Sequence, residues 1–259
     1  MEQETTITLT TDRAAAAWLD AMQRLCGVTP KGRYGERGDA RAMVTHATIA
    51  SLNAALSTTL DPDVESLDEM AAEVGRFGLP WSIIVRGEAS DAVAGLAASH
   101  GLTRHGAMPF MTCTVGDAVL GAVEERRTPI RAVGSTESDR YTDALVAGFG
   151  VPAGAFGSLM GGRVLDTPAF TGYLAEVSGR PVATGLGLQG ADAVGVFNIS
   201  VVPSARSRGL GRAMTARAMA DGFAAGADIA YLHASTAGQP LYESMGFRLA
   251  ETWTTFTAP

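Results

Sequence analysis

Apolar residues recur at helical spacing in two segments of the first hundred residues. The first segment predicts a helix over 12–26, capped by Thr11, and the second predicts a helix over 63–78. The glycine-rich, charged stretch 27–39 between them is typical of a loop. Residues 43–60 alternate weakly and include β-branched side chains, so we expect one or two strands there.

Strands and helices alternate through the rest of the chain. We predict strands over 80–86, 109–114, 130–133, 170–177, 181–188, 194–202, 229–234 and 248–257, and helices over 91–100, 138–149, 209–226 and 240–245. Ser178 and Gly179 separate two of the strands and predict a hairpin turn. The sequence becomes polar between about 116 and 128, which is typical of a linker.

The same order of elements occurs on both sides of that linker. A strand, a helix, a glycine followed by an apolar residue, and a last strand occur around Gly101 and again around Gly246. Aligning these two glycines places Ala97 opposite Tyr242. We therefore divide the chain into two similar units, 1–115 and 129–259, joined by the linker 116–128. Each is expected to be an α/β unit, a mixed sheet flanked by helices.

Composition narrows the classes of function. The chain is 46% hydrophobic and 18% charged with a net charge of −7, which fits folded cores and argues against nucleic acid as the main partner. Cys26 and Cys113 lie far apart without paired histidine spacing, so we expect free thiols and no metal site. The acidic N-terminus is unlike a signal peptide, and no apolar run reaches about 20 residues. We expect a soluble cytoplasmic protein, a monomer or homodimer, that does not bind membranes.

One segment concentrates positive charge in this acidic chain. Residues 202–214 predict a strand that breaks at Pro203, a loop with three arginines, and a helix that opens at about Gly209. Unpaired N–H groups and the helix dipole make such a helix start a site for anions. The glycines let an anion approach the backbone, which favours a pyrophosphate site over a merely solvated loop. The equivalent loop of the first unit, 60–65, is acidic and lacks glycine, so it would repel phosphate.

Two motifs carry a resemblance to a known family. Arg206-Ser-Arg-Gly-Leu-Gly211 resembles the Arg/Gln-x-x-Gly-x-Gly/Ala signature of the GCN5-related N-acetyltransferases (GNAT). The segment 234–247 resembles that family's closing motif, in which a tyrosine precedes Gly-Phe by four residues. The resemblance covers about 129–257, and the first unit resembles the degenerate amino-terminal half of tandem members. It implies two GNAT-like domains with twisted mixed sheets, and transfer of an acetyl group from acetyl-CoA to an amine.

The resemblance also implies roles for individual residues. The strand end at Val201 and Val202 would pair its backbone with the pantetheine arm and place an N–H at the developing oxyanion. Tyr242 would donate a proton or a hydrogen bond to the departing thiolate. Asn198 would orient the substrate, although a polar residue satisfied by backbone fits this position equally well. The residues expected at the pyrophosphate are Arg206, Ser207, Arg208, Gly209, Leu210, Gly211, Arg212 and Ala213.

The base that takes the proton of the amine is open at this stage. Glu176, His233 and Asp192 are candidates, and for each a structural role is also open. We expect a small amine-bearing acceptor in the cleft between the units, and the acidic balance favours a cationic one. Two alternatives stand beside this function. One is an acyltransferase with another acyl-CoA or a hydroxyl acceptor, and the other is a non-catalytic acyl-CoA sensor or scaffold.

Overall fold

The computed structural model describes residues 2–121 and 128–259, with side chains from residue 8 onward. Residues 122–127 of the proposed linker thus lie outside the described residues. The helices are α1 (Glu2–Val28), α2 (Val64–Gly75), α3 (Asp91–Ser99), α4 (Ser138–Phe149), α5 (Leu210–Ala224) and α6 (Gln239–Glu243). The strands are β1 (Arg33–Arg37), β2 (Ala40–Val44), β3 (Asn53–Ser57), β4 (Ser82–Val85), β5 (Arg104–Thr114), β6 (Ile130–Val133), β7 (Phe170–Val177), β8 (Arg180–Gln189), β9 (Ala193–Val201), β10 (Ile229–His233) and β11 (Arg248–Thr257).

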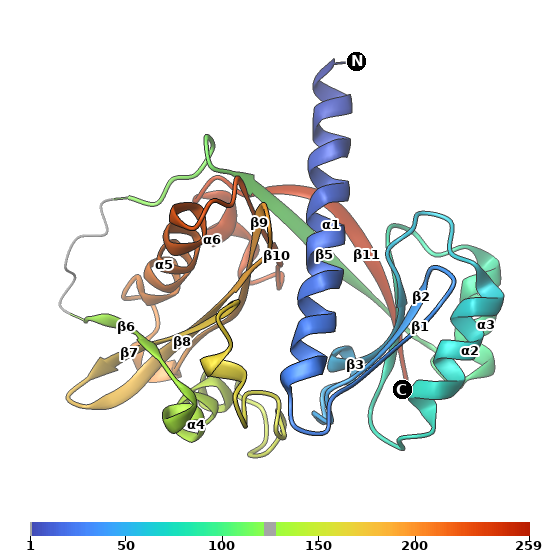
Figure 1. The fold of residues 1–259 in the computed structure, drawn as a ribbon, viewed down its shortest axis with the longest axis horizontal. Coiled ribbons are helices and arrows are strands. Elements are labelled where there is room, and N and C mark those ends of the chain that lie inside the picture. Colours follow the sequence, from blue (N-terminus) through green and yellow to red (C-terminus); the bar gives the residue numbers. More distant parts are fainter. Residues whose placement is uncertain (1, 122–127) are drawn as a thin grey trace.

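In the part of the chain that the structure describes, eleven strands form one mixed sheet in the order β1-β2-β3-β4-β11-β5-β10-β9-β8-β7-β6 (Figure 1). The α/β fold expected from the sequence is confirmed. Parallel pairs occur between β3 and β4 and between β9 and β10, and the other neighbours are antiparallel. The element order strand, helix, strand, helix, strand is the same from β3 to β5 as from β9 to β11.

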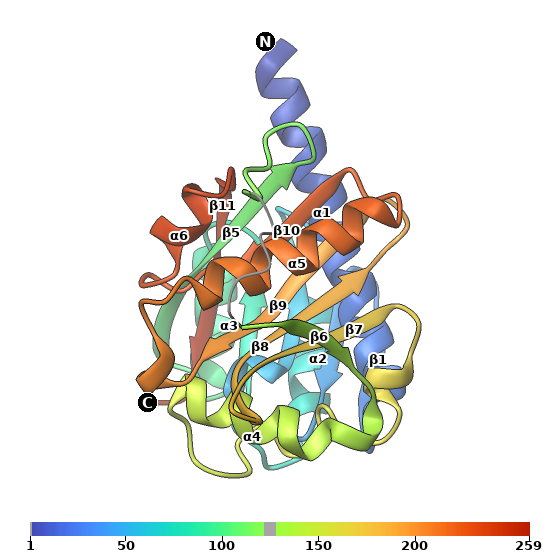
Figure 2. The ribbon, with the colours of Figure 1, turned by 90° about the vertical axis from the view of Figure 1, so that its left-hand side faces the viewer.

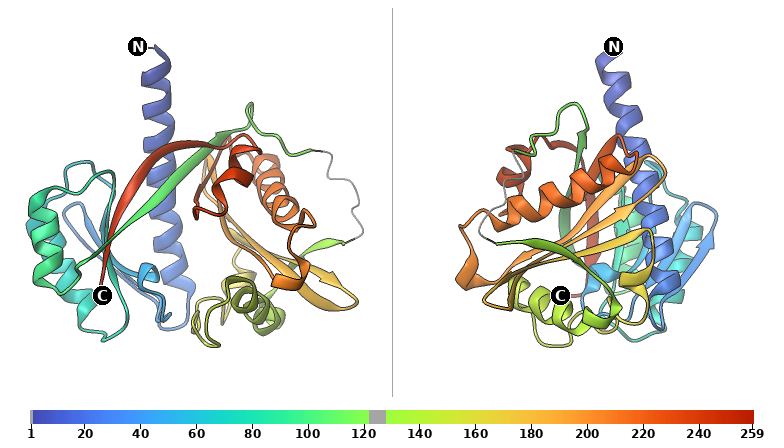
Figure 3. Two further views of the ribbon diagram at one scale, coloured as in Figure 1. Left: turned by 180° about the vertical axis from the view of Figure 1, so that it is seen from behind. Right: turned by 60° about the vertical axis from the view of Figure 1, so that its left-hand side comes forward.

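The last strands of the two halves are exchanged in the middle of the sheet. β5 belongs in sequence to the amino-terminal half, yet it pairs with β10 of the carboxy-terminal half. β11, the last strand of the chain, pairs with β4 on one side and with β5 on the other. Figure 3 shows these two long strands crossing the molecule together between the halves. Neither half therefore completes its sheet from its own sequence.

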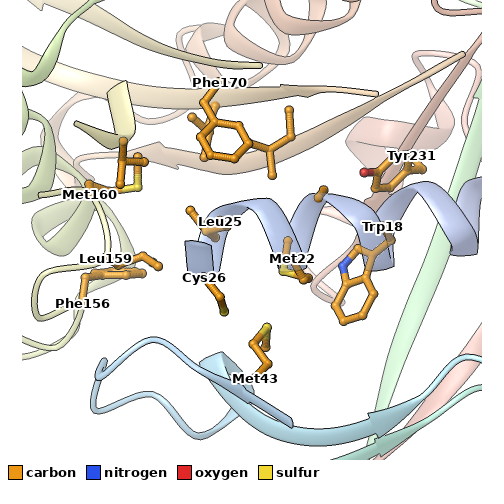
Figure 4. Packing of buried hydrophobic residues seen from close by; sticks show 14 of the residues in the cluster. Trp18, Met22, Leu25, Cys26, Met43, Phe156, Leu159, Met160, Phe170 and Tyr231 are labelled. Atoms are coloured by element: carbon orange, nitrogen blue, oxygen red, sulfur yellow. The ribbon is translucent and has the colours of Figure 1, made fainter. Parts of the chain in front are cut away.

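Helix α1 packs into the space between the two halves. Met43 of β2 lies on one side of it, while Leu159, Met160 and Phe170 from the carboxy-terminal half lie on the other (Figure 4). Trp18 of α1 is 4% exposed and contacts the ring of Trp253 at 5.0 Å between centroids. One hydrophobic core therefore spans both halves, and the interdomain cleft expected from the sequence is largely filled by α1.

Helices cover both faces of the carboxy-terminal part of the sheet (Figure 2). α5 lies on the face that carries Tyr173 and Val194, and α4 on the face that carries Leu174 and Leu186. The hairpin turn between β7 and β8 is as predicted, since Ser178 and Gly179 both adopt positive φ, 52° and 75°.

Two expectations for the first forty residues are wrong. α1 begins at Glu2 rather than at a cap at Thr11, and Thr11 is 4% exposed within the helix. The threonines of the first turns have low helix propensity, which is a weak signal that the surrounding structure overrides. The predicted loop 27–39 contains β1, an edge strand rich in charged residues that pairs with β2. Charged side chains are common on edge strands and hide the alternating pattern.

None of the helices, over the residues the structure describes, is both long enough and apolar enough to cross a membrane. The same residues contain no group of three histidine, cysteine, aspartate or glutamate side chains placed to hold a metal ion. Cys26 and Cys113 are both free and buried, and burial raises the pKa of the Cys113 thiol to about 11.

Candidate functional site

The parallel strands β9 and β10 separate partway along their length. Their pairing starts at Ala193 with Ile229 and ends at Gly195 with Tyr231. β9 then continues to Val201 without a partner on that side, and β10 continues to His233. The backbone edge of β9 beyond Gly195 is therefore open to an extended ligand that can hydrogen-bond like a strand.

Glycine and a buried tyrosine shape the point where the strands part. A Cβ on Gly195 would lie 2.3 Å from the ring of Phe197 and 2.7 Å from the Tyr231 hydroxyl oxygen, so no other residue fits there. The Tyr231 hydroxyl donates to the carbonyl oxygen of Ala17 in α1 at 3.1 Å. Helix α1 of the amino-terminal half thus contacts the carboxy-terminal sheet directly at the start of the gap.

Residue Asn198 forms a bulge in β9. Its φ is 53°, and the register with β8 shifts between Thr184 and Leu186. Its carbonyl oxygen accepts from the Thr184 hydroxyl at 2.7 Å, and its side-chain amide contacts the sulfur of Met160 at 3.6 Å. The structure therefore gives Asn198 local partners, and its substrate-orienting role stays a prediction.

The two valines at the end of β9 differ in what their main-chain groups can bind. The Val202 N–H donates to the carbonyl of Val182 in β8, and the Val202 carbonyl accepts from the Ala205 N–H. Successive residues of an antiparallel pair direct their main-chain groups to opposite sides, so those of Val201 face the gap. Both main-chain groups of Val202 already have partners within the protein, so its pairing with a ligand stays a prediction.

A tight turn follows β9 and leads into α5. A 3-10 turn at Pro203–Ala205 ends the strand, Ser207 and Gly209 adopt φ of 60° and 77°, and α5 starts at Leu210. Left-handed residues alternating with right-handed ones turn successive N–H groups toward one concave side, which binds anions. We call residues 203–212 the Arg-Gly turn.

Six consecutive N–H groups of this turn are available. The backbone N–H groups of residues 207–212 donate to no other residue in the described part of the chain. The Ala213 N–H, in contrast, donates to the Gly209 carbonyl at 3.0 Å, so its contact with pyrophosphate stays a prediction. Free donors at the start of a fifteen-residue helix are placed as at helix starts that bind anions.

The three arginine side chains of the turn all have partners within the protein. Arg206 donates from Nε to the Val201 carbonyl at 3.1 Å and from Nη2 to the Gly148 carbonyl at 2.8 Å. Arg208 donates to the Ser204 carbonyl at 2.9 Å, and Arg212 donates to Ser244 beside α6. Arg206 and Arg208 remain exposed and add positive charge, while Arg212 ties α5 to the end of α6.

Helix α6 brings Tyr242 close to the Arg-Gly turn. The side chain of Leu241, which precedes Tyr242 in the sequence, would lie 3.4 Å from a Cβ on Gly211. Helix α6 therefore packs beside the start of α5. The Tyr242 ring contacts Phe247 edge to face at 5.8 Å, and burial raises the pKa of its hydroxyl to about 12. No hydrogen bond of its hydroxyl occurs among the described residues, so the hydroxyl is available as a donor.

Each of the three candidate bases is either bound by arginine or enclosed, so none is an exposed proton acceptor beside Tyr242. Glu176 lies on β7, separated from β10 by β8 and β9, and Arg140 binds its carboxylate at 2.6 Å. Asp192 accepts from Arg13 of α1. The His233 ring nitrogens are enclosed, and burial lowers its pKa to about 3, although the carbonyls of Met108 and Pro109 offset part of that effect.

The corresponding place in the amino-terminal half is closed. β3 and β4 pair from Ala54 with Ser82 through Ser57 with Val85, so these parallel strands do not separate. The Asp39 carboxylate accepts from the Thr59 hydroxyl at 2.7 Å and from the Asp63 N–H at 3.2 Å. The carboxylate of Asp39, which lies outside the acidic loop 60–65 named from the sequence, thus occupies donors at this place.

Sequence reasoning missed Gly148 near the end of α4. A Cβ there would lie 1.8 Å from the Ser200 hydroxyl oxygen and 3.0 Å from the Val201 nitrogen. Its lack of a side chain lets α4 lie directly against the open part of β9. A glycine inside an otherwise helical segment is the signal that pointed to such a close approach.

Comparisons with known proteins agree with this geometry. Residues 168–249, which include β7 to the start of β11, match the family model described as an acetyltransferase (GNAT) domain. No curated protein matches the sequence.

Several solved structures share the whole fold. A GCN5-related N-acetyltransferase from Kribbella flavida is 20% identical with a TM-score of 0.67, and the alignment covers 96% of this chain and 95% of that one. A GCN5-related N-acetyltransferase-like protein from Streptococcus suis is 11% identical with a TM-score of 0.57, over 92% and 98% of the two chains. One from Sphaerobacter thermophilus is 17% identical with a TM-score of 0.56, over 85% and 76%.

The TM-scores and coverages show a shared fold that extends over both halves of this chain. The matched family model covers the parting strands, the Arg-Gly turn and Tyr242 together. Residues 168–249 of this chain are therefore a GNAT acetyltransferase domain.

Proposed function

We propose that the carboxy-terminal half transfers an acetyl group from acetyl-CoA to the amine of a small molecule by direct attack within a ternary complex. The observation that carries this proposal is the combination of the open edge of β9 with six free N–H donors at residues 207–212. An extended amide-bearing arm that ends in a diphosphate is the ligand that matches both features. We also propose that residues 1–115 are a degenerate copy of the same unit, joined to it by 116–128.

The fit of CoA to these residues rests on charge and donor geometry. The N–H groups over Ser207–Arg212 and the helix dipole of α5 would hold the diphosphate, and exposed Arg208 would add positive charge. The main-chain groups of Val201 would pair with the pantetheine amides, since they face the gap. The bound group supplies a thioester-activated acetyl carbon.

Near the gap, backbone donors would stabilise developing negative charge. Attack by the amine nitrogen forms the new C–N bond and moves negative charge to the carbonyl oxygen. An N–H of the open β9 edge beyond Gly195 would donate to this oxygen. Breaking of the C–S bond would then re-form the carbonyl and release CoA as a thiolate, which would take a proton from water. The nitrogen would lose its proton to water, which leaves the acetylated amine.

Tyr242 would act on the departing sulfur as a hydrogen-bond donor. A thiol has a pKa of about 8.5 in water, well below the pKa of about 12 for the enclosed Tyr242 hydroxyl. Full transfer of the phenol proton to a thiolate is therefore uphill, whereas a hydrogen bond to the thiolate needs no transfer. The phenol remains protonated throughout the neutral range and is available as a donor there.

The amine proton would leave through water rather than to one of the three candidates from the sequence. Glu176 is held by arginines, and His233 is too weakly basic and too enclosed to accept a proton from the acceptor. An amine that binds in its neutral form, or loses its proton to solvent at the mouth of the gap, requires no dedicated side chain.

A thiol-release assay with acetyl-CoA across a panel of small amines tests the proposal. We expect release of CoA that depends on both protein and amine. In Tyr242→Phe, turnover should fall at least tenfold while CoA still binds with near wild-type affinity in calorimetry. Absence of CoA binding by the wild-type protein would exclude the proposed cofactor. CoA binding without turnover for any amine, and with Tyr242→Phe indistinguishable from wild type, would favour a non-catalytic acyl-CoA sensor instead.

A further inference from the structure

We propose that Arg206 is a positioning residue for the pantetheine arm, acting through a clamp between β9 and α4 rather than through contact with the diphosphate. This inference rests on the proposed CoA site and concerns how that site keeps its shape. It changes the role expected from the sequence, in which Arg206 added charge at the pyrophosphate.

The contacts of Arg206 support a bridging role. Its Nε donates to the carbonyl of Val201, the last residue of β9, and its Nη2 donates to the carbonyl of Gly148, in the last turn of α4. A planar guanidinium that satisfies two carbonyls on different elements is fixed in direction. Turning it toward a diphosphate would break both hydrogen bonds.

The two elements that Arg206 bridges touch at the open part of β9. The Ser200 hydroxyl donates to the Leu145 carbonyl of α4 at 3.3 Å. Gly148 has no side chain, and a Cβ there would lie 3.0 Å from the Val201 nitrogen. Contacts with α4 therefore fix the orientation of both main-chain groups of Val201 that face the gap. The N–H lies beside Gly148 of α4, and the carbonyl accepts from Arg206, which also binds the Gly148 carbonyl.

The carboxyl end of α4 also attracts the positive charge of Arg206. The carboxyl end of a helix carries a partial negative charge of about half an electron. α4 ends next to the Arg-Gly turn, so its exposed carbonyls would oppose an arriving diphosphate. The positive charge of Arg206 offsets the partial negative charge of these carbonyls while its guanidinium keeps both hydrogen bonds, to Val201 and to Gly148.

The clamp predicts an effect on a ligand that has no diphosphate. S-acetyl-pantetheine carries the arm and the thioester but neither phosphate nor nucleotide. If Arg206 orients the Val201 peptide, its loss weakens S-acetyl-pantetheine as well as acetyl-CoA, and Arg206→Gln also removes a positive charge near the diphosphate of acetyl-CoA. If Arg206 contacts the diphosphate, only acetyl-CoA is affected.

Arg208 provides a matched control in the same turn. It carries the same charge and is also exposed, but its guanidinium binds only the Ser204 carbonyl, four residues away. It therefore joins no two elements. Arg208→Gln removes one positive charge near the diphosphate and should weaken acetyl-CoA without changing the affinity for S-acetyl-pantetheine.

The experiment measures dissociation constants of both ligands for the full-length protein by ligand-detected NMR or calorimetry. Arg206→Gln should raise the dissociation constant for S-acetyl-pantetheine by about fivefold, the scale of one lost hydrogen bond at a partly exposed site. Arg206→Lys keeps the charge but lacks the planar fork, so it should not rescue that affinity. A urea melt of each variant checks that it is folded. If Arg206→Gln is unfolded, the affinities of Arg206→Lys are used in its place.

The outcomes separate this inference from the proposed function. Weakening of S-acetyl-pantetheine as well as acetyl-CoA in the Arg206 variants, with only acetyl-CoA weakened in Arg208→Gln, supports the clamp. Unchanged S-acetyl-pantetheine affinity in Arg206→Gln overturns it, even if acetyl-CoA binds more weakly. Failure of the wild-type protein to bind either ligand removes the proposed CoA site, and the clamp with it.

Discussion

The enclosed imidazole of His233 predicts that the protein loses stability in mild acid. Its ring packs against Trp18, Phe110 and Trp253 at centroid distances of 4.8 to 5.7 Å. Neither ring nitrogen has a hydrogen-bond partner among the described residues, and neither contacts solvent. Burial disfavours the charged form and lowers the pKa from 6.5 to about 3.

The sign and size of the effect follow from proton binding in the two states. Between pH 3 and 6.5 the unfolded chain binds a proton at this residue and the folded chain does not, so stability rises with pH across that interval. Relative to pH 8, the expected loss at pH 5 is about 2 kcal/mol. That is a large share of the total stability of a typical domain, which is about 5–15 kcal/mol.

Urea unfolding of wild type and of His233→Phe, at pH 8 and pH 5 and constant ionic strength, measures this contribution. The phenyl ring cannot titrate, so the variant should lose about 2 kcal/mol less between the two pH values. Any cost of packing the phenyl ring is present at both pH values and cancels in the difference. His105→Asn, at an exposed position, is the control and should keep the wild-type dependence. If His233→Phe and wild type lose equal stability at pH 5, the imidazole is not enclosed as described.

Two further predictions concern the Arg-Gly turn and the exchanged strands. Gly209→Ala forces an alanine into φ of 77° and should cost about 1 kcal/mol and weaken CoA binding. Gly211→Ala should be tolerated, because its Cβ would lie 3.4 Å from the Leu241 side chain and 4.0 Å from that of Val201, which are ordinary contacts. Urea melts and calorimetry compare the two variants, and equal effects would contradict the assigned roles. A fragment of residues 116–259 lacks β5, so it should show no cooperative unfolding transition until a fragment of 1–115 is added; a cooperative, CoA-binding fragment alone would show that β5 is not needed.

The Arg-Gly turn was predictable because its determinants are local. Pro203 ends the strand, Gly209 takes the left-handed conformation, and α5 begins at the next residue, as the sequence indicated. The final strand, β11, begins and ends at the predicted residues, Arg248 and Thr257. In each case the information lies within a few neighbouring residues, where turn chemistry and alternation act.

The partners of β5 and of Arg206 could not be predicted in the same way. Alternating apolar residues identify β5 as a strand, but the pattern is equally compatible with any neighbour in the sheet. The sequence predicted Arg206 beside an anion site, and its hydrogen bond to Gly148 joins residues 58 positions apart. His233 was a reasonable candidate base by residue type, and only its packing against Trp18 and Trp253 reveals a neutral, enclosed ring.

The amino-terminal half contributes packing to the carboxy-terminal half. β5 lies between β10 and β11, and the Tyr231 hydroxyl at the parting of β9 and β10 is bound by Ala17 of α1. Removing this half would expose an edge of β10 and the side chains packed on α1. In the amino-terminal half the Asp39 carboxylate accepts from the Thr59 hydroxyl and the Asp63 N–H, so these donors are satisfied from within the chain. The proposed acetyl transfer in one half therefore depends on packing supplied by the other, even though the diphosphate site is proposed for one half alone.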